Sequence, residues 1–83
     1  MNKVYLFGKI LAKSKLKYII QPKLKIYIML VVQTIDNNEI CCIVPENLCD
    51  NLKHTNINKH IYILGRGIYI DNKFSVLVEE MYY

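Results

Sequence analysis

Apolar and polar residues alternate with a period of two along most of this chain, which restricts it to a mainly β fold. In the longest run, residues 23–34, five successive even positions are apolar. Because successive residues of a strand point to opposite faces, one side of this run is predicted to be buried and the other exposed. The predicted core positions are Leu24, Ile26, Ile28, Leu30 and Val32, and the predicted outer positions are Lys23, Lys25, Tyr27, Met29, Val31 and Gln33.

Strand patterns also cover residues 2–12, 39–44, 60–70 and 74–81. Gly8 predicts a bend in the first of these segments. Apolar residues occur there at both odd and even positions, which predicts that both faces of this strand are buried. A short segment at residues 16–20 reaches a turn at Gln21-Pro22, because proline cannot donate a ladder hydrogen bond.

Two short polar segments predict hairpin turns. They are residues 36–39 and 71–73, and both contain asparagine, which tolerates the positive φ of tight turns. On the return strand of the first hairpin, Ile40, Cys42 and Val44 are predicted to point inward, and Pro45 ends the strand.

The one helical pattern lies at residues 46–53, where Leu48, Cys49 and Leu52 fall on one side. The order is therefore three main strands, one short helix and two strands. This is the order of an all-β, five-stranded OB-fold Greek-key barrel, with the helix between its third and fourth strands. A chain of 83 residues has room for one core, so residues 1–83 are predicted to form a single OB-fold domain.

Charge is divided unevenly along the chain. All seven acidic residues lie at or after Asp36, whereas seven of the eleven basic residues precede it. The early lysines interleave with apolar residues, so the alternation lines them along one face, as a nucleic-acid phosphate backbone requires. The predicted nucleic-acid contacts are Lys9, Lys13, Lys15, Lys17, Lys23, Lys25, Tyr27 and Arg66. The alternative is a solvated basic face without a specific partner.

The aromatic residues divide by parity. Tyr27 shares the parity of Lys25 and is the best candidate for stacking on a base, whereas Tyr18 is more often a core residue. Several outward positions are apolar, which is more typical of a subunit interface than of a solvated surface. The predicted oligomer interface comprises Tyr5, Phe7, Tyr62, Leu64 and Ile68.

Catalysis, metal binding and membrane insertion have little support in the sequence. Cys49, His54 and His60 lack a metal-ligand spacing, and Gly65-Arg66-Gly67 lies in a strand pattern with no helix after it. No cofactor, metal or catalytic residue is therefore predicted. The chain shows no signal-peptide pattern or membrane span, and three cysteines suit a reducing compartment, so we expect a cytoplasmic protein.

Two stretches carry a family resemblance. Residues 2–10, NKVYLFGKI, and residues 58–66, NKHIYILGR, resemble the first and fourth strands of the bacterial single-stranded DNA-binding protein (SSB) family, which includes primosomal replication protein N. The resemblance implies an OB-fold that binds single-stranded DNA, usually as a symmetric oligomer. This chain departs from the family in having no Trp, Glu39 and Pro45 at stacking positions, short hairpin tips and no acidic tail. These departures indicate either a truncated core or a minimal member near primosomal protein N.

We therefore expect non-catalytic, largely sequence-independent binding of single-stranded DNA in replication, repair or mobile-element maintenance. The expected partners are single-stranded DNA, a second copy of the chain in a dimer or tetramer, and replication proteins. The alternative is an OB-fold protein-interaction module that acts as an accessory subunit of a replication complex.

Overall fold

The alternating segments form six strands in the computed structural model, which describes residues 2–19, 24–52 and 55–83. The predicted turn at Gln21-Pro22 and the residues Lys23, Lys53 and His54 lie outside these ranges. The elements in chain order are β1 (Val4–Lys13), β2 (Lys17–Ile19), β3 (Lys25–Thr34), β4 (Glu39–Pro45), α1 (Glu46–Cys49), the 3-10 turn η1 (Asp50–Leu52), β5 (His60–Ile70) and β6 (Lys73–Tyr82).

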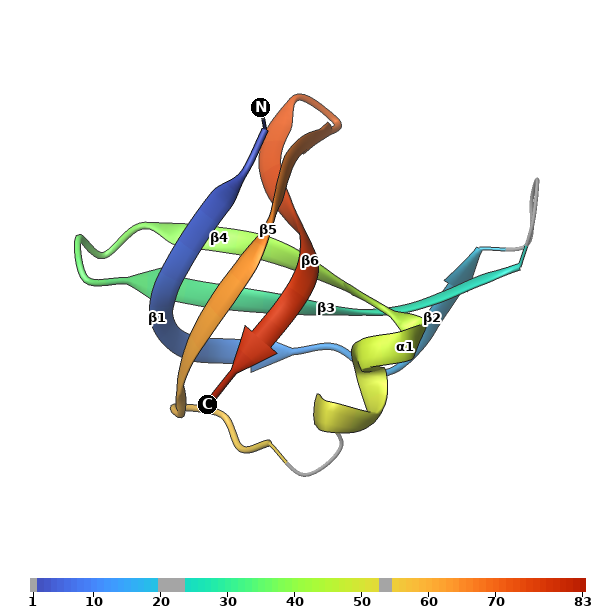
Figure 1. Ribbon diagram of the computed structural model, residues 1–83, viewed down its shortest axis with the longest axis horizontal. Helices are drawn as coiled ribbons and strands as arrows, with labels where there is room; N and C mark the ends of the chain where they lie inside the picture. Colours follow the sequence, from blue (N-terminus) through green and yellow to red (C-terminus); the bar gives the residue numbers. More distant parts are fainter. Residues whose placement is uncertain (1, 20–23, 53–54) are drawn as a thin grey trace.

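Five of these strands close into a barrel (Figure 1). The sheet order is β1-β5-β6-β4-β3-β2, and a further pairing of β1 with β3 closes the barrel and leaves β2 outside it. All pairings are antiparallel except that of β4 with β6, so the barrel is mixed. The helical segment lies between β4 and β5 in sequence. The predicted OB-fold barrel with one short helix is therefore confirmed.

The barrel interior holds the residues that alternation places inward. Ile28, Leu30 and Val32 of β3 are buried, as are Cys42 and Val44 of β4. The helical segment adds two further core residues, Cys49 and Leu52. Burial raises the pKa of the Cys42 thiol to about 12, so this cysteine stays protonated and behaves as a small apolar residue.

The β2–β3 hairpin projects from the barrel (Figure 1), and we call residues 17–19 and 24–27 the arm. Three core predictions fail there. Leu24 is 63% exposed, Tyr18 is 65% exposed, and Ile26 is half-buried and not part of the core. Alternation continues through the arm, but none of the described residues forms a second layer over Leu24 and Tyr18 once β3 has left the barrel.

β1 bends so that it can pair with two strands. Residues 4–9 pair with β5 and residues 8–13 pair with β3. Gly8 lies in both pairings, as expected for a glycine at a bend, and a Cβ atom there would come within 2.4 Å of the Gln33 carbonyl oxygen. The expectation that this segment is buried on both sides is wrong, because Tyr5 is 80% exposed.

Both predicted hairpin turns are present. Asn37 adopts a φ of 66° in the β3–β4 turn, and Asp71 and Asn72 adopt φ values of 52° and 64° between β5 and β6. Two consecutive left-handed residues twist a hairpin in the sense that its strands require. The β5–β6 hairpin keeps one register from Gly65 to its two-residue tip, beyond a bulge between Leu64 and Gly65.

Replacing Gly8 with Ala should destabilise the barrel by about 1–3 kcal/mol, because the added methyl group overlaps backbone that is fixed by β1–β3 pairing. Urea unfolding followed by circular dichroism measures the change. Gly67→Ala is the control, since its methyl group meets the Phe74 ring, which can rotate. Equal losses of stability in the two variants would contradict the proposed importance of the close approach at Gly8.

Candidate nucleic-acid interface

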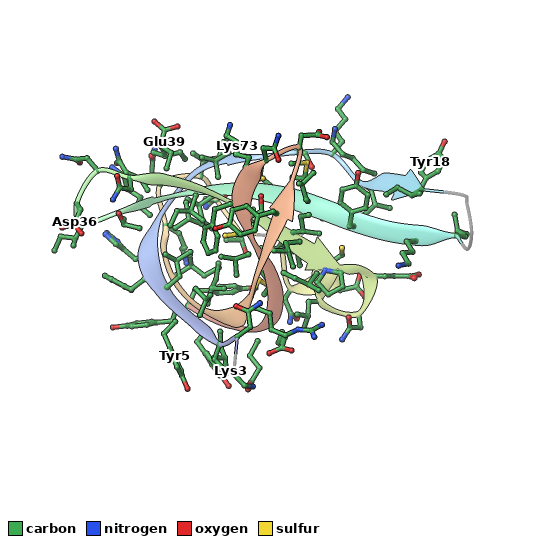
Figure 2. All side chains as sticks on the ribbon, turned by 90° about the horizontal axis from the view of Figure 1, so that it is seen from above. Lys3, Tyr5, Tyr18, Asp36, Glu39 and Lys73 are labelled. Atoms are coloured by element: carbon green, nitrogen blue, oxygen red, sulfur yellow. The ribbon has the colours of Figure 1, made fainter. Side chains whose placement is uncertain are left out.

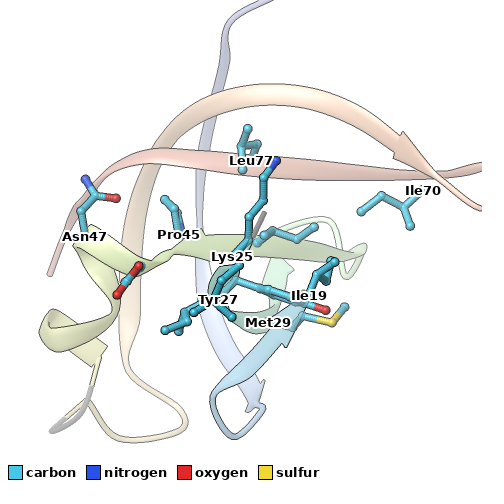
Figure 3. Close-up of a pocket in the computed structure, with 12 residues that line it drawn as sticks. Ile19, Lys25, Tyr27, Met29, Pro45, Asn47, Ile70 and Leu77 are labelled. Atoms are coloured by element: carbon cyan, nitrogen blue, oxygen red, sulfur yellow. The ribbon is translucent and has the colours of Figure 1, made fainter. Parts of the chain in front are cut away.

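A groove of about 630 Å³ runs over the outer surface of the barrel, and we call it the outer groove. Figure 3 shows its lining residues, which come from the arm, β4, the start of α1 and the β5–β6 hairpin. They are Ile19, Leu24, Lys25, Ile26, Tyr27, Met29, Ile43, Pro45, Glu46, Asn47, Ile70 and Leu77. Most are aliphatic, so the groove offers apolar contacts with few hydrogen-bonding groups.

Two predicted contact residues line this groove together. Lys25 and Tyr27 lie two positions apart on β3, and Tyr27 is half-buried. Lys17 of β2 is directly opposite Tyr27 in the antiparallel pairing. Side chains of directly opposed residues share a face, so Lys17 joins Lys25 and Tyr27 on the groove side of the arm.

Cations also approach the groove from the β5–β6 hairpin. Arg66 lies opposite the lining residue Leu77, and Lys73 lies opposite the lining residue Ile70. The Arg66 Nε atom is 3.3 Å from the Glu79 carboxylate, and both side chains are partly exposed. Such surface pairs contribute little free energy, so the guanidinium can exchange this carboxylate for a phosphate. Basic residues therefore border the groove on the arm and on the β5–β6 hairpin.

The sequence did not single out the aliphatic part of the groove or Lys73. Met29, Ile43 and Leu77 are outward residues of three strands, and only the register brings them together. Alternation around the Asp71-Asn72 turn was a usable signal for Lys73, because it places this lysine beside Ile70.

Lys13 does not lie with the other lysines. A β-bulge between Ile10 and Ala12 shifts the β1–β3 register, so Lys13 is opposite the buried residue Leu30. Its ammonium donates hydrogen bonds to the carbonyl oxygens of Leu52, at 2.8 Å, and Thr55, at 3.2 Å. Lys13 therefore satisfies carbonyl groups at the end of η1, and the expectation that it shares a face with Lys15 and Lys17 is wrong.

The remaining predicted lysines are dispersed. Lys15 is exposed in the link between β1 and β2, and Lys23 lies outside the described residues. Lys9 lies on β1 between Gln33 of β3 and His60 of β5. It is therefore at the end of β3 that is far from the outer groove.

A second exposed surface is aromatic, and we call it the aromatic face. Its lining includes Tyr5, Phe7, Tyr62, Leu64 and Tyr82 around a hollow of about 580 Å³. The Phe7 and Tyr62 ring centroids are 4.4 Å apart. Four predicted interface residues thus gather here together with Tyr82, which was not predicted, whereas Ile68 lies further along β5 opposite Ser75. In Figure 2, Tyr5 lies on the body of the barrel, away from Tyr18 at the arm.

Residues 2–19, 24–52 and 55–83 contain no group of three or more His, Cys, Asp or Glu side chains that could hold a metal ion. No helix within those ranges is long and apolar enough to cross a membrane.

Lys13→Met should lower the free energy of unfolding by about 1.5 kcal/mol, because the variant leaves the Leu52 and Thr55 carbonyl oxygens without their charged donor. Thermal and urea unfolding measure this loss, and Lys15→Met, in an exposed link, is the matched control. If Lys13→Met proves as stable as Lys15→Met, the two carbonyl contacts do not stabilise the fold.

Comparison with known proteins gives matches among solved structures only. No family model matches the sequence, and no curated protein matches it. The SSB domain of a Synechococcus protein superposes with a TM-score of 0.83 at 17% identity, covering 100% of this chain and 96% of that chain. A PriB protein from Ralstonia solanacearum gives a TM-score of 0.77 at 9% identity, covering 100% and 97%.

The yeast mitochondrial single-stranded DNA binding protein Rim1 matches with a TM-score of 0.72 at 14% identity, covering 96% of this chain and 90% of that chain. At these identities the matches establish a shared fold. The chain therefore has the OB-fold in the form found in SSB domains and PriB proteins.

Proposed function

We propose that this protein binds single-stranded DNA in the outer groove and performs no catalysis. The observation that carries the proposal is one continuous surface: an apolar groove with Tyr27 in its lining and basic residues on the two hairpins that border it. Tyrosine stacks on any base, and basic residues neutralise the adjoining phosphates.

The charges around the groove favour a polyanion. Lys25 lines the groove, and Lys17, Lys73 and Arg66 lie opposite lining residues on neighbouring strands. Glu46 is the one acidic residue among the described lining residues, and Glu79 lies beside Arg66. Cations on several elements repel one another until an anion lies between them. A phosphate backbone that crosses from one hairpin to the other relieves this repulsion.

The lining also argues against strong sequence preference. Reading a base requires hydrogen-bond donors and acceptors placed at its edge, and aliphatic residues such as Met29, Ile43 and Leu77 have none. Stacking and apolar contact accept all bases. The name of one protein with this fold, yeast Rim1, states single-stranded DNA binding, and this also supports the proposal.

We further propose that two copies associate through the aromatic face. Tyr5 is 80% exposed and Tyr62 is 58% exposed, although both are large and partly apolar. A two-fold contact would pair this patch with itself and bury it. A PriB N-terminal domain with the same fold, from Thermoanaerobacter tencongensis, is described as dimeric.

The aromatic face also supports a second candidate function, that of a protein-interaction module in a replication complex. In that case a different protein would cover the face. A parent chain that is monomeric and does not bind single-stranded oligonucleotides would favour this function over DNA binding.

Tyr27→Ala should weaken binding to a labelled single-stranded oligonucleotide by about 1–3 kcal/mol if the ring stacks on a base. Lys25→Ala should weaken binding and flatten the salt dependence. With about four phosphates neutralised, the parent's log K against log[salt] should have a slope of about −3. Fluorescence anisotropy at several salt concentrations measures both quantities.

The matched controls are Tyr18→Ala, at an exposed arm residue that is not part of the groove lining, and Lys59→Ala, near the start of β5. Neither should change affinity appreciably. A salt-independent affinity, or equal affinity for duplex DNA, would contradict groove binding. An unchanged affinity with a sharply lower melting temperature for Tyr27→Ala would make this ring structural.

Leu64→Glu should convert an oligomeric parent into a monomer, because it places a charge in the aromatic face beside Tyr5 of β1. Light scattering at tens of micromolar measures the mass of each protein. Ile57→Glu, at an exposed position outside this face, is the control. A monomeric parent refutes the oligomer, and an unchanged oligomer in Leu64→Glu moves the interface elsewhere.

A further inference from the structure

A smaller hollow of about 260 Å³ lies where the β3–β4 hairpin separates from β1, and we call it the hairpin pocket. It is lined by Phe7, Gly8, Lys9, Gln33, Thr34, Ile35, Asn37 and His60. Its volume is near the lower end of small-molecule sites, which begins at about 300 Å³. It therefore suits one planar group rather than a large ligand.

The chemistry of this pocket differs from that of the outer groove. Gln33, Lys9 and His60 form a row across β3, β1 and β5, because Lys9 pairs with both of the others. Phe7 stacks on His60 with ring centroids 5.5 Å apart and an interplanar angle of 15°. The pocket thus combines a flat aromatic surface, side-chain amides and an ammonium group.

Four polar side chains of the pocket have no hydrogen-bond or ion-pair partner within the described ranges. No hydrogen bond or ion pair engages the side chains of Lys9, Gln33, Asn37 or His60 among residues 2–19, 24–52 and 55–83. An amide can donate to and accept from the edge of a nucleobase, and an ammonium can neutralise its phosphate. These groups are therefore available to a nucleotide.

The pocket also lies on the same strand as the groove. Tyr27, Met29, Val31 and Gln33 are alternate residues of β3, so they share its outer face and lead from the outer groove to the hairpin pocket. Six residues of a strand span roughly 20 Å at about 3.3 Å per residue. A strand that keeps the stacked rise of about 3.4 Å per nucleotide needs about six nucleotides to cover this span, within the site sizes of OB-folds.

We propose that the hairpin pocket binds one nucleotide of the strand whose other end occupies the outer groove. The base stacks on the Phe7–His60 pair, the amides of Gln33 and Asn37 meet its edge, and Lys9 contacts the neighbouring phosphate. This inference rests on the proposed function. Because the outer groove has few groups that can read a base edge, any base preference of the strand would arise in the hairpin pocket.

The test compares labelled oligonucleotides of five and twelve nucleotides. The double variant Gln33→Leu with His60→Ala should bind the twelve-mer at least fivefold more weakly than the parent and the five-mer within twofold of it. Tyr27→Ala should weaken both. The matched control, Asn56→Leu with Ile57→Ala, makes similar changes in the exposed connection before β5 and should alter neither affinity.

Phe7 is left intact in these variants because it also belongs to the aromatic face. A second measurement uses the parent protein and follows the NMR signal of its His60 ring. This signal should shift when the twelve-mer is added and should not shift with the five-mer. If the double variant binds the twelve-mer as tightly as the parent does, the hairpin pocket does not bind a nucleotide. The proposal that DNA binds in the outer groove would still stand. Equal weakening for both lengths also overturns the proposal for the hairpin pocket. If the parent binds neither length, the proposed function fails and the inference fails with it.

Discussion

The close contact between β1 and β3 at Gly8 is the constraint on which the rest of the structure depends. β1 leaves β5 and joins β3 within a few residues, and Gly8 is paired with both strands. The Gln33 carbonyl comes so near that a side chain has no room. Without this approach the sheet would remain open, and the strands that border the outer groove would not be held in one curved surface.

The bulge that follows Gly8 decides which lysines can meet a ligand. Alternation places every second residue on the same face of a strand only while the pairing register is unbroken. The extra residue between Ile10 and Ala12 shifts the β1–β3 register, so the residues of β1 beyond it point to the opposite face. Lys13 is turned to the end of η1 by this inversion, while Lys17 and Lys25 remain on the groove side of the arm. One residue of register thus separates a structural lysine from the candidate binding lysines.

The sequence was sufficient for features that are local. Alternation predicted the buried positions of β3 and β4, and the asparagine-containing turns predicted both hairpins. It was insufficient where position depends on partners far along the chain. Leu24 lies at an even position of the run, as the buried residues of β3 do. Whether other residues cover it depends on where the barrel ends.

The same limit applied to the candidate site. Tyr27 and Lys25 could be predicted because they are neighbours on one strand, whereas the lining residues Ile43 and Leu77 come from strands joined only by the parallel β4–β6 register. Register between distant strands is set by closure of the whole barrel and cannot be read from a local pattern.

The two main surfaces can act together because they do not overlap. The outer groove and the hollow of the aromatic face share no lining residue, so association through Tyr5 and Tyr62 would leave each outer groove open. The hairpin pocket adjoins the aromatic face, because Phe7 lines both. One tyrosine and a few cations provide limited affinity in a single groove. If two copies associate as proposed, a strand that reaches the second groove would bind there intramolecularly, at an effective concentration that can reach the millimolar range. Dimerisation would therefore raise the affinity for long strands far more than for short ones, without any additional contact in the groove itself.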